Sequence, residues 1–176
     1  MEFPLTARNA IIHGTALPES PRPMRRRAET EATARLAEAV FGPGTEISHD
    51  IHGAPFIAGR PENISISHGA GIAVMAVSHK AVGIDIECRR PSLRRTASKF
   101  LSEEELAVYG TSDMMLLRAW TAKEALFKAI GNPQLTVSLI TLPSDPDAGT
   151  VSMAGHTYTL TRFCEADTVI TLAVAE

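Results

Sequence analysis

The apolar positions of residues 113–130 recur at the three- and four-residue spacing of a helix. They are Leu116, Trp120, Phe127 and Ile130. Alanines occupy the opposite side, and a helix that is apolar nearly all round is buried. Yet Lys123 and Glu124 project within roughly 60° of Trp120. Buried charge is costly unless it is paired or bound, so we expect these two side chains and the nearby Lys128 to have a partner.

The patterning predicts two further helices. One covers about residues 24–41 and is stopped by Gly42-Pro43-Gly44. A shorter one begins at the capping box Ser102-Glu103-Glu104-Glu105. The central helix is expected to begin at Asp113 as its N-cap and to end at Gly131.

Alternating polarity in residues 63–69 predicts a strand with two serines on one face. The apolar run 71–78 is typical of a buried central strand, and residues 82–87 are expected to pair with it as a hairpin. Further strands are predicted at residues 10–12, 135–142, 150–153, 157–163 and 168–174. Helices beside an antiparallel sheet imply an α+β fold class.

Length and composition change this picture little. The chain has 176 residues, 44% hydrophobic and 21% charged, which suits one globular domain or two small fused halves. Its net charge of −3 does not favour a nucleic-acid partner. Cys88 and Cys164 lack metal-ligand spacing and are typical of free thiols in a reducing compartment. The sequence shows no signal peptide and no transmembrane stretch, so we expect a cytoplasmic protein without a membrane partner.

Asp85 and Glu87 are two apart on a predicted strand, so both carboxylates leave the same face. Adjacent carboxylates repel, and a cation between them would relieve the repulsion. Mg²⁺ commonly binds one or two carboxylates together with substrate phosphate oxygens. For an isolated pair of this kind, a solvated strand face is the more common explanation.

Glu124 offers a third carboxylate, flanked by Lys123 and Lys128. Its simplest alternative is a surface ion pair with Lys128, worth a few tenths of a kcal/mol. The apolar setting of the helix argues against that alternative. Three acids with nearby lysines suit a site for a metal and a diphosphate.

Ser67-His68-Gly69 ends a predicted strand, where it could hold a phosphate. A nucleophilic Ser/His pair and an ordinary polar turn are the alternatives, although adjacent residues rarely reach nucleophilic geometry. His49 and His52 have no further ligands at metal spacing and are interpreted as loop histidines. Two arginine clusters, normally a solvated feature, are Arg22 with Arg25, Arg26 and Arg27, and Arg89, Arg90, Arg94 and Arg95.

Taken in order, these segments resemble the 4′-phosphopantetheinyl transferase superfamily. Residues 83–87 match its G-I/V-D-x-E motif, and residues 120–128 match its W-x-x-K-E-A/S-x-x-K motif. Ser65-Ile66-Ser67-His68 is similar to the segment found in the surfactin-synthetase-activator type, which the short trimeric carrier-protein synthases lack. Residues 100–105 resemble the element between the two main motifs. The resemblance covers about residues 22–131.

The resemblance implies two similar α+β halves with antiparallel sheets, with the active site between them as in a dimer made of one chain. Residues 1–82 would form the half that contacts coenzyme A, and residues 83–176 the half with the metal site and the main helix. The implied reaction transfers phosphopantetheine from coenzyme A to a serine of an acyl or peptidyl carrier protein. Adenosine 3′,5′-bisphosphate is the second product, and the chain is expected to be a monomer.

The resemblance also implies residue roles. Asp85, Glu87 and Glu124 would bind Mg²⁺, or Mn²⁺ in its place. Glu124 and Lys128 would be catalytic, with Glu124 accepting the carrier serine proton. Coenzyme A would be held by Ser67, His68, Arg25, Arg26, Arg27 and Lys123.

The chain departs from the family pattern at Gly53-Ala54-Pro55, where the family often has a lysine in the middle position. It is also short for the two-half type. These departures motivate an alternative, a non-catalytic member that binds a carrier protein or coenzyme A. A metal-dependent hydrolase of a nucleotide diphosphate is a third hypothesis. The carrier could belong to fatty-acid, polyketide or nonribosomal peptide biosynthesis.

Overall fold

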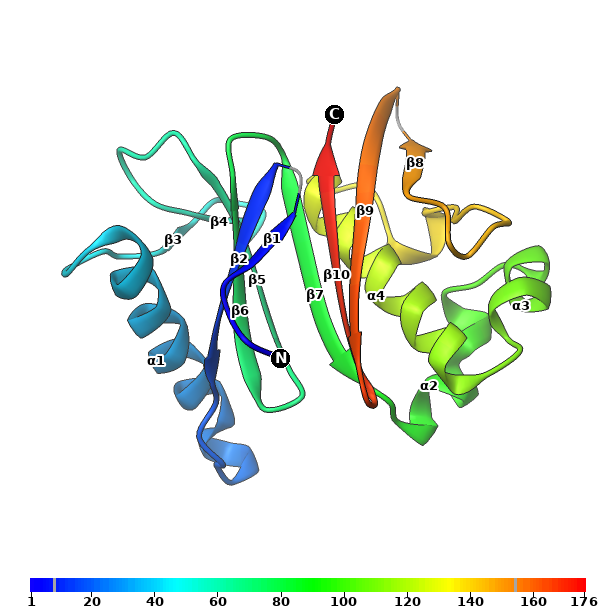
Figure 1. The fold of residues 1–176 in the computed structure, drawn as a ribbon, viewed down its shortest axis with the longest axis horizontal. Helices are drawn as coiled ribbons and strands as arrows, with labels where there is room; N and C mark the ends of the chain where they lie inside the picture. Colours follow the sequence, from blue (N-terminus) through cyan, green and yellow to red (C-terminus); the bar gives the residue numbers. More distant parts are fainter. Residues whose placement is uncertain (8, 154) are drawn as a thin grey trace.

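Two four-stranded antiparallel sheets form the centre of the molecule (Figure 1). The computed structural model describes all residues except 8 and 154. The first sheet has the order β1-β2-β6-β5, with β1 (Leu5–Ala7), β2 (Ala10–Ala16), β5 (Asn63–Gly69) and β6 (Ile72–Ser78). The second has the order β7-β10-β9-β8, with β7 (Val82–Cys88), β8 (Thr150–Met153), β9 (His156–Glu165) and β10 (Thr168–Ala175).

Helices flank the two sheets on separate sides (Figure 1). The long helix α1 (Arg22–Phe41) packs on the first sheet, and α4 (Asp113–Ile130) packs on the second. The remaining helices are α2 (Pro91–Thr96), the 3-10 turn η1 (Ala97–Lys99), α3 (Glu103–Tyr109) and the 3-10 turn η2 (Val137–Leu139). A small ribbon, β3 (Ser48–His49) with β4 (Pro55–Phe56), follows α1. The α+β class predicted from the sequence is confirmed.

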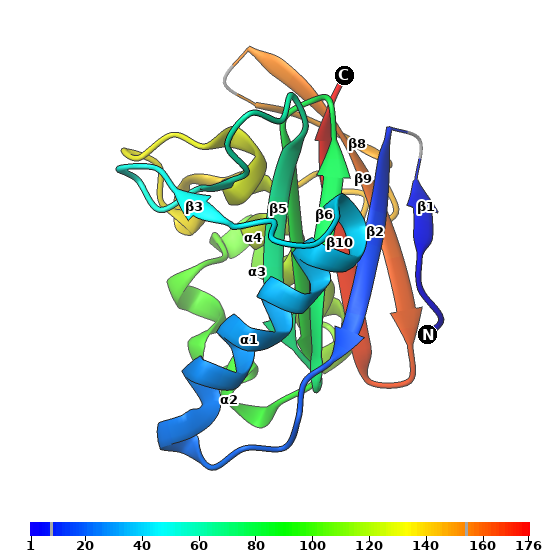
Figure 2. The ribbon, with the colours of Figure 1, turned by 90° about the vertical axis from the view of Figure 1, so that its left-hand side faces the viewer.

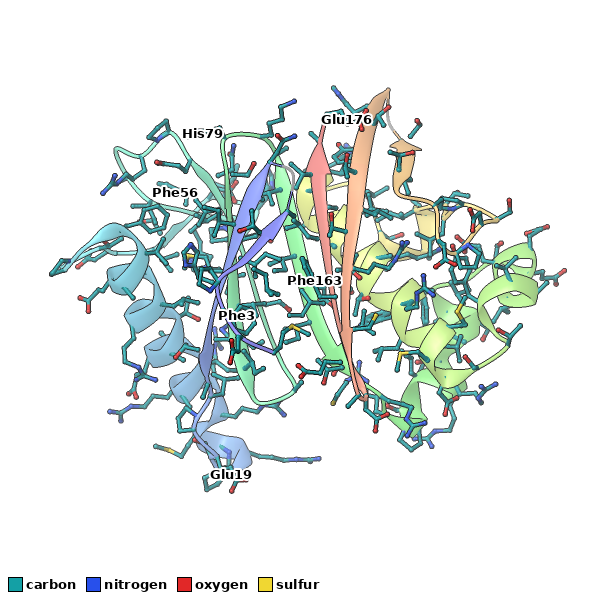
Figure 3. The ribbon with its side chains drawn as sticks, viewed as in Figure 1. Phe3, Glu19, Phe56, His79, Phe163 and Glu176 are labelled. Carbon is teal, nitrogen blue, oxygen red and sulfur yellow. The ribbon has the colours of Figure 1, made fainter. Side chains whose placement is uncertain are left out.

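Besides the apolar residues packed under α1 and under α4, a separate apolar cluster lies between the sheets. It joins residues of β2 and β6 to Ile84, Ile86 and the apolar side chains of β10. Phe3 and Phe163, labelled in Figure 3, pack against this cluster. No helix in the described part of the chain is long and apolar enough to cross a membrane.

The two sheets share one order of connection. A strand leads to a long helix, and the hairpin that follows returns its second strand to pair with the first. In the first sheet these elements are β2, α1, β5 and β6, and in the second they are β7, α4, β9 and β10. The site described below lies where these two units meet.

Strands β5 and β7 meet through serine side chains rather than through a backbone ladder. The backbone N–H of Ile84 donates to Ser65 Oγ at 3.0 Å, and that of Ile86 donates to Ser67 Oγ at 3.3 Å. A Cβ on Gly69 would lie 2.1 Å from the carbonyl oxygen of Ile86, so only glycine permits this approach. The serines expected on one face of residues 63–69 therefore join the two sheets.

Glycines also position α4. A Cβ on Gly83 would lie 1.9 Å from the carbonyl oxygen of Ala125, so glycine lets the helix backbone lie directly on β7. The helix ends at Gly131, whose φ of 62° is left-handed. Its N-cap is Ser112, which accepts from the backbone N–H of Met115, and not Asp113 as expected from the sequence.

The helices were predicted more accurately than the strand pairings. The expected helices at residues 24–41 and 113–130 and the capping box at Ser102 are confirmed. The expected hairpin of residues 71–78 with 82–87 is wrong, because β6 pairs with β2 and β5 whereas β7 pairs with β10. The strand expected at 135–142 is also wrong, since this segment contains the 3-10 turn η2.

Candidate functional site

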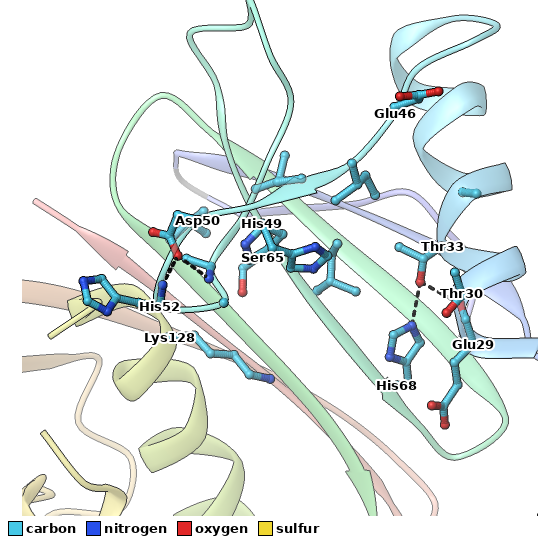
Figure 4. A pocket seen from close by; sticks show the side chains of 18 of the residues that line it. Glu29, Thr30, Thr33, Glu46, His49, Asp50, His52, Ser65, His68 and Lys128 are labelled. Carbon is cyan, nitrogen blue, oxygen red and sulfur yellow. Dashed lines mark hydrogen bonds between the residues drawn. The ribbon is translucent and has the colours of Figure 1, made fainter. Parts of the chain in front are cut away.

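A pocket of about 890 Å³ opens between the two units (Figure 4). One wall is the face of α1 that carries Glu29 and Thr33, and the floor is β5 with Ser65 and His68. The loop at residues 44–55 forms the rim, and the C-terminal end of α4 closes the far side with Lys128. In Figure 2 the ribbon β3 and the helix α1 face the viewer, and residues of both line the pocket together with Lys128 of α4. The pocket is therefore built by both sheets together.

Lys128 connects the pocket to the buried carboxylate of Asp85. Its ammonium donates to the carbonyl oxygen of Ile84 at 2.8 Å and to Asp85 Oδ1 at 2.9 Å. The same Oδ1 accepts from Ser67 Oγ at 2.8 Å, and Asp85 is 7% exposed. A β5 hydroxyl, a β7 carboxylate and an α4 ammonium thus converge where the two units join.

Glu124 lies one turn before Lys128 in α4 and is half-buried. Burial raises the pKa of its carboxyl group, and the nearby charge of Asp85 raises it further, while Lys128 acts in the opposite direction. Among the described residues, no group forms a hydrogen bond or ion pair with this carboxylate. Glu124 can accordingly accept a proton or a cation.

Glu87 does not share the surroundings of the other two acids. Its Oε2 lies 3.0 Å from Nη2 of Arg90, and its Oε1 accepts from the backbone N–H of Cys88 at 3.0 Å. Within the described part of the chain, no three His, Cys, Asp or Glu side chains lie close enough together to hold a metal ion. The structure therefore brings Asp85 and Glu124 into electrostatic contact but leaves Glu87 paired with Arg90.

Ser67 and His68 have different positions. Ser67 is buried at the strand junction and does not line the pocket, whereas His68 does. His68 Nε2 lies 2.6 Å from Thr33 Oγ1 on α1. Burial lowers the pKa of His68, with Glu29 raising it and Lys128 lowering it.

The three consecutive arginines of α1 point in different directions. Arg26 lines the pocket. Arg25 Nε pairs with Glu29 at 3.1 Å, and Arg27 Nε pairs with Glu31 at 2.7 Å. All three arginines were expected to contact coenzyme A, but only Arg26 is in the lining of the pocket, and Arg25 and Arg27 lie outside it.

Lys123 corrects one expectation. It was expected to contact coenzyme A, but it is 0% exposed and its ammonium lies 2.7 Å from Glu105 Oε2. Glu105 also accepts from the backbone N–H groups of Ser102 and Leu142. A ligand could reach Lys123 only by opening the core, so this lysine joins α4 to α3. The sequence did show that Glu105 belongs to a capping box. Local spacing could not show that its carboxylate also pairs with Lys123.

Sequence reasoning also missed residues at the pocket rim. His49 and His52, interpreted as loop histidines, both line the pocket. Between them, the Asp50 carboxylate accepts from the backbone N–H groups of His52 and Ala54 at 2.8 and 2.9 Å, which fixes the turn (Figure 4). Thr33 was missed as well, because its partner His68 lies on a distant strand.

Comparison with known families gives one match. The ACPS family, described as the 4′-phosphopantetheinyl transferase superfamily, matches residues 81–172, just over half of the chain. A comparison with curated proteins gives no match. The matched region includes Asp85 and Lys128, which pair with each other, and Glu124, which lies one turn before Lys128 in α4. The chain therefore belongs to the 4′-phosphopantetheinyl transferase superfamily, a family of transferases.

Proposed function

We propose that this protein transfers 4′-phosphopantetheine from coenzyme A to a serine of an apo carrier protein, in a reaction that depends on Mg²⁺. Membership of the superfamily supports phosphopantetheine transfer. The observation that carries the finer proposal is Lys128, which lines a pocket with room for a nucleotide and pairs with Asp85, whose charge also acts on Glu124.

The carboxylates suit a divalent cation. Asp85 raises the pKa of Glu124, so the two charges repel, and a cation between them would relieve this repulsion. Oxygen ligands of this kind are preferred by Mg²⁺. Asp85 and Glu124 would hold the ion, and Glu87 would join them after leaving Arg90. When bound, the ion supplies charge stabilisation for the diphosphate.

The remaining roles follow from position and charge. Glu124 accepts the proton of the carrier serine hydroxyl, whose oxygen then forms a bond to the β-phosphorus of coenzyme A. The bond from that phosphorus to the bridging oxygen breaks, and adenosine 3′,5′-bisphosphate leaves. Lys128 binds the diphosphate, and Arg26 and His68 bind the nucleotide phosphates.

The assembly around this reaction is part of the proposal. The repeated strand–helix–hairpin order of the two sheets supports a monomer in which two units form one site, as in the surfactin-synthetase-activator type. Residues 1–82 would form the coenzyme A half and residues 83–176 the metal half. We expect a cytoplasmic enzyme acting on carriers of fatty-acid, polyketide or nonribosomal peptide biosynthesis.

The direct test is a mass measurement. Several unrelated apo carrier proteins are incubated with coenzyme A, Mg²⁺ and the protein, alongside a known transferase as a positive control. We expect one carrier to gain a single phosphopantetheine group, and no gain on any carrier would contradict the proposal. Glu124→Gln should abolish the gain, while the exposed Glu103→Gln should leave it intact.

The same assay separates the alternatives. Coenzyme A binding measured by calorimetry, with no modified carrier, would indicate a non-catalytic binding protein. Release of adenosine 3′,5′-bisphosphate without any carrier would indicate a hydrolase. The unpaired carboxylate of Glu124 favours the transferase over a binding protein, since a protein that only binds has no need of a base at this position.

A further inference from the structure

Thr33 makes two contacts through a single hydroxyl group. Its Oγ1 lies 2.8 Å from the backbone carbonyl oxygen of Glu29 and 2.6 Å from Nε2 of His68 (Figure 4). Both distances are those of hydrogen bonds. A threonine hydroxyl has one proton, so it can donate to only one of these partners.

The identity of the two partners decides where the protons lie. A carbonyl oxygen can only accept, so both contacts are hydrogen bonds only when the Thr33 proton points to Glu29. Oγ1 must then accept from His68, which places a proton on Nε2. In the neutral imidazole only one nitrogen carries a proton, so Nδ1 is left unprotonated.

Nδ1 is available to a ligand. His68 lines the pocket. Among the described residues, no group forms a hydrogen bond with Nδ1. This atom is also not fully buried, so a ligand in the pocket can reach it. A neutral Nδ1 can only accept, whereas an anion requires a donor, so an anion binds there only if Nδ1 takes up a proton.

Burial lowers the pKa of His68, so Nδ1 is unprotonated until an anion beside it stabilises the imidazolium. The lining carries two permanent cations, Arg26 of α1 and Lys128 of α4, and the second is shared with Asp85 of β7. Four carboxylates and two further histidines also line it: Glu29, Glu38, Glu46, Asp50, His49 and His52. The lining therefore carries more carboxylates than permanent cations, which disfavours a polyanion. A protonated histidine adds a positive charge that favours it.

We propose that Thr33 is a positioning residue that holds His68 with Nε2–H toward α1 and Nδ1 toward the pocket, so that binding of a phosphate is coupled to protonation of Nδ1. The identification of that phosphate as one of coenzyme A rests on the proposed function. The tautomer of His68 does not rest on it, because it follows from the ligand-free structure.

The first experiment measures the tautomer by ¹⁵N NMR of the ligand-free protein above pH 8. We expect a protonated Nε2 and an unprotonated Nδ1 for His68, in the wild type and in Thr33→Ser. Thr33→Val should populate the Nδ1–H tautomer. Thr30→Val is the matched control, because Thr30 bonds to the carbonyl of Arg26 one turn earlier in α1 and should leave the tautomer unchanged. An Nδ1–H tautomer in the wild type would overturn the proposal.

The second experiment measures coenzyme A binding by calorimetry, in two buffers of different ionisation enthalpy and from pH 6 to 9. We expect proton uptake on binding, an affinity that falls as pH rises, and smaller uptake in His68→Gln. Thr33→Val should bind about 3- to 10-fold more weakly, as the loss of one neutral hydrogen bond implies, with Thr33→Ser close to wild type. Equal affinity and equal uptake in Thr33→Val would overturn the positioning role. If no variant binds coenzyme A, the proposed function and the proton coupling both fail, while the NMR result still decides the tautomer.

Discussion

The ammonium of Lys123 and the carboxylate of Glu105 form an ion pair of 2.7 Å in the core, where the two side chains are 0% and 7% exposed. Two backbone N–H groups complete the shell of Glu105, those of Ser102 and Leu142. The pair thus ties α4 to the start of α3 and to the chain after η2. Because α4 also carries Glu124 and Lys128, the same contact helps to fix the position of Glu124 and of Lys128, which lines the pocket.

Removing one partner of this ion pair should be costly. Lys123→Met leaves the Glu105 charge buried without its cation, and we expect a loss of about 3–5 kcal/mol in the free energy of unfolding, measured by urea denaturation. Replacing both residues by apolar ones, as in Lys123→Met with Glu105→Leu, should recover part of that loss. Lys99→Met is the matched control on an exposed lysine, with an expected change within about 0.5 kcal/mol. A Lys123→Met variant as stable as this control would mean that the pair does not hold α4.

Gly69→Ala tests the junction of the two sheets. The added Cβ would lie 2.1 Å from the carbonyl oxygen of Ile86, so β5 and β7 must separate. We expect a loss of about 1–3 kcal/mol on thermal unfolding, together with weaker coenzyme A binding because Ser67 moves away from Asp85. Gly149→Ala is the control, since its Cβ meets no atom within 4 Å. Equal melting temperatures for the two variants would show that the junction is not tightly packed.

Glu124→Gln should make the protein more stable at neutral pH while abolishing activity. The pKa of Glu124 is raised in the folded state, mainly by burial and then by Asp85, so folding disfavours its ionised form. This penalty is fully present above the folded pKa and disappears as pH falls below the ordinary value for glutamate. Denaturation at pH 8 and pH 4 measures it, and the stabilisation should be present at pH 8 and absent at pH 4. A variant less stable than wild type at pH 8 would contradict this assignment.

The same raised pKa sets the sign of the pH–rate profile. A base must be ionised, so transferase activity should be present above the folded pKa of Glu124 and lost as pH falls through it. Because burial and Asp85 raise that pKa in the metal-free protein, whereas a bound cation favours the ionised form, the loss should begin at a higher pH when Mg²⁺ is limiting than when it is saturating. Rates at saturating coenzyme A, measured over pH 4 to 8, give this limb of the profile. A flat profile across this range would remove Glu124 as the base.

Lys128→Met should weaken coenzyme A binding. The ammonium now bonded to Asp85 and Ile84 is the cation of α4 that lines the pocket. Hydrogen bonds to charged groups contribute about 1.5–3 kcal/mol, so we expect the dissociation constant to rise about 10- to 100-fold. Calorimetry measures this change, with the exposed Lys80→Met as control. An unchanged dissociation constant would place the phosphates elsewhere in the pocket.

Local patterning determined the helices and part of the site. The period of apolar residues and the Ser102 capping box defined α4 and α3, because helix signals arise within one segment. The apolar surroundings of Glu124 indicated that its charge was not an ordinary surface charge, and the structure shows it half-buried beside Asp85. The positions of Glu124 and Lys128 one turn apart also follow from helical geometry alone.

Tertiary contacts decided the rest, because they join residues that no local spacing relates. Strand β7 pairs with β10 along its whole length, and its other side meets the serines of β5. Lys123 became a core residue because Glu105 lies beside it only after α3 folds back on α4. His68 likewise reaches its partner Thr33 of α1 only when β5 lies against that helix. The sequence by itself predicted a set of candidate site residues, and the packing of the two units decided that His68 and Lys128 line the pocket whereas Lys123 lies in the core.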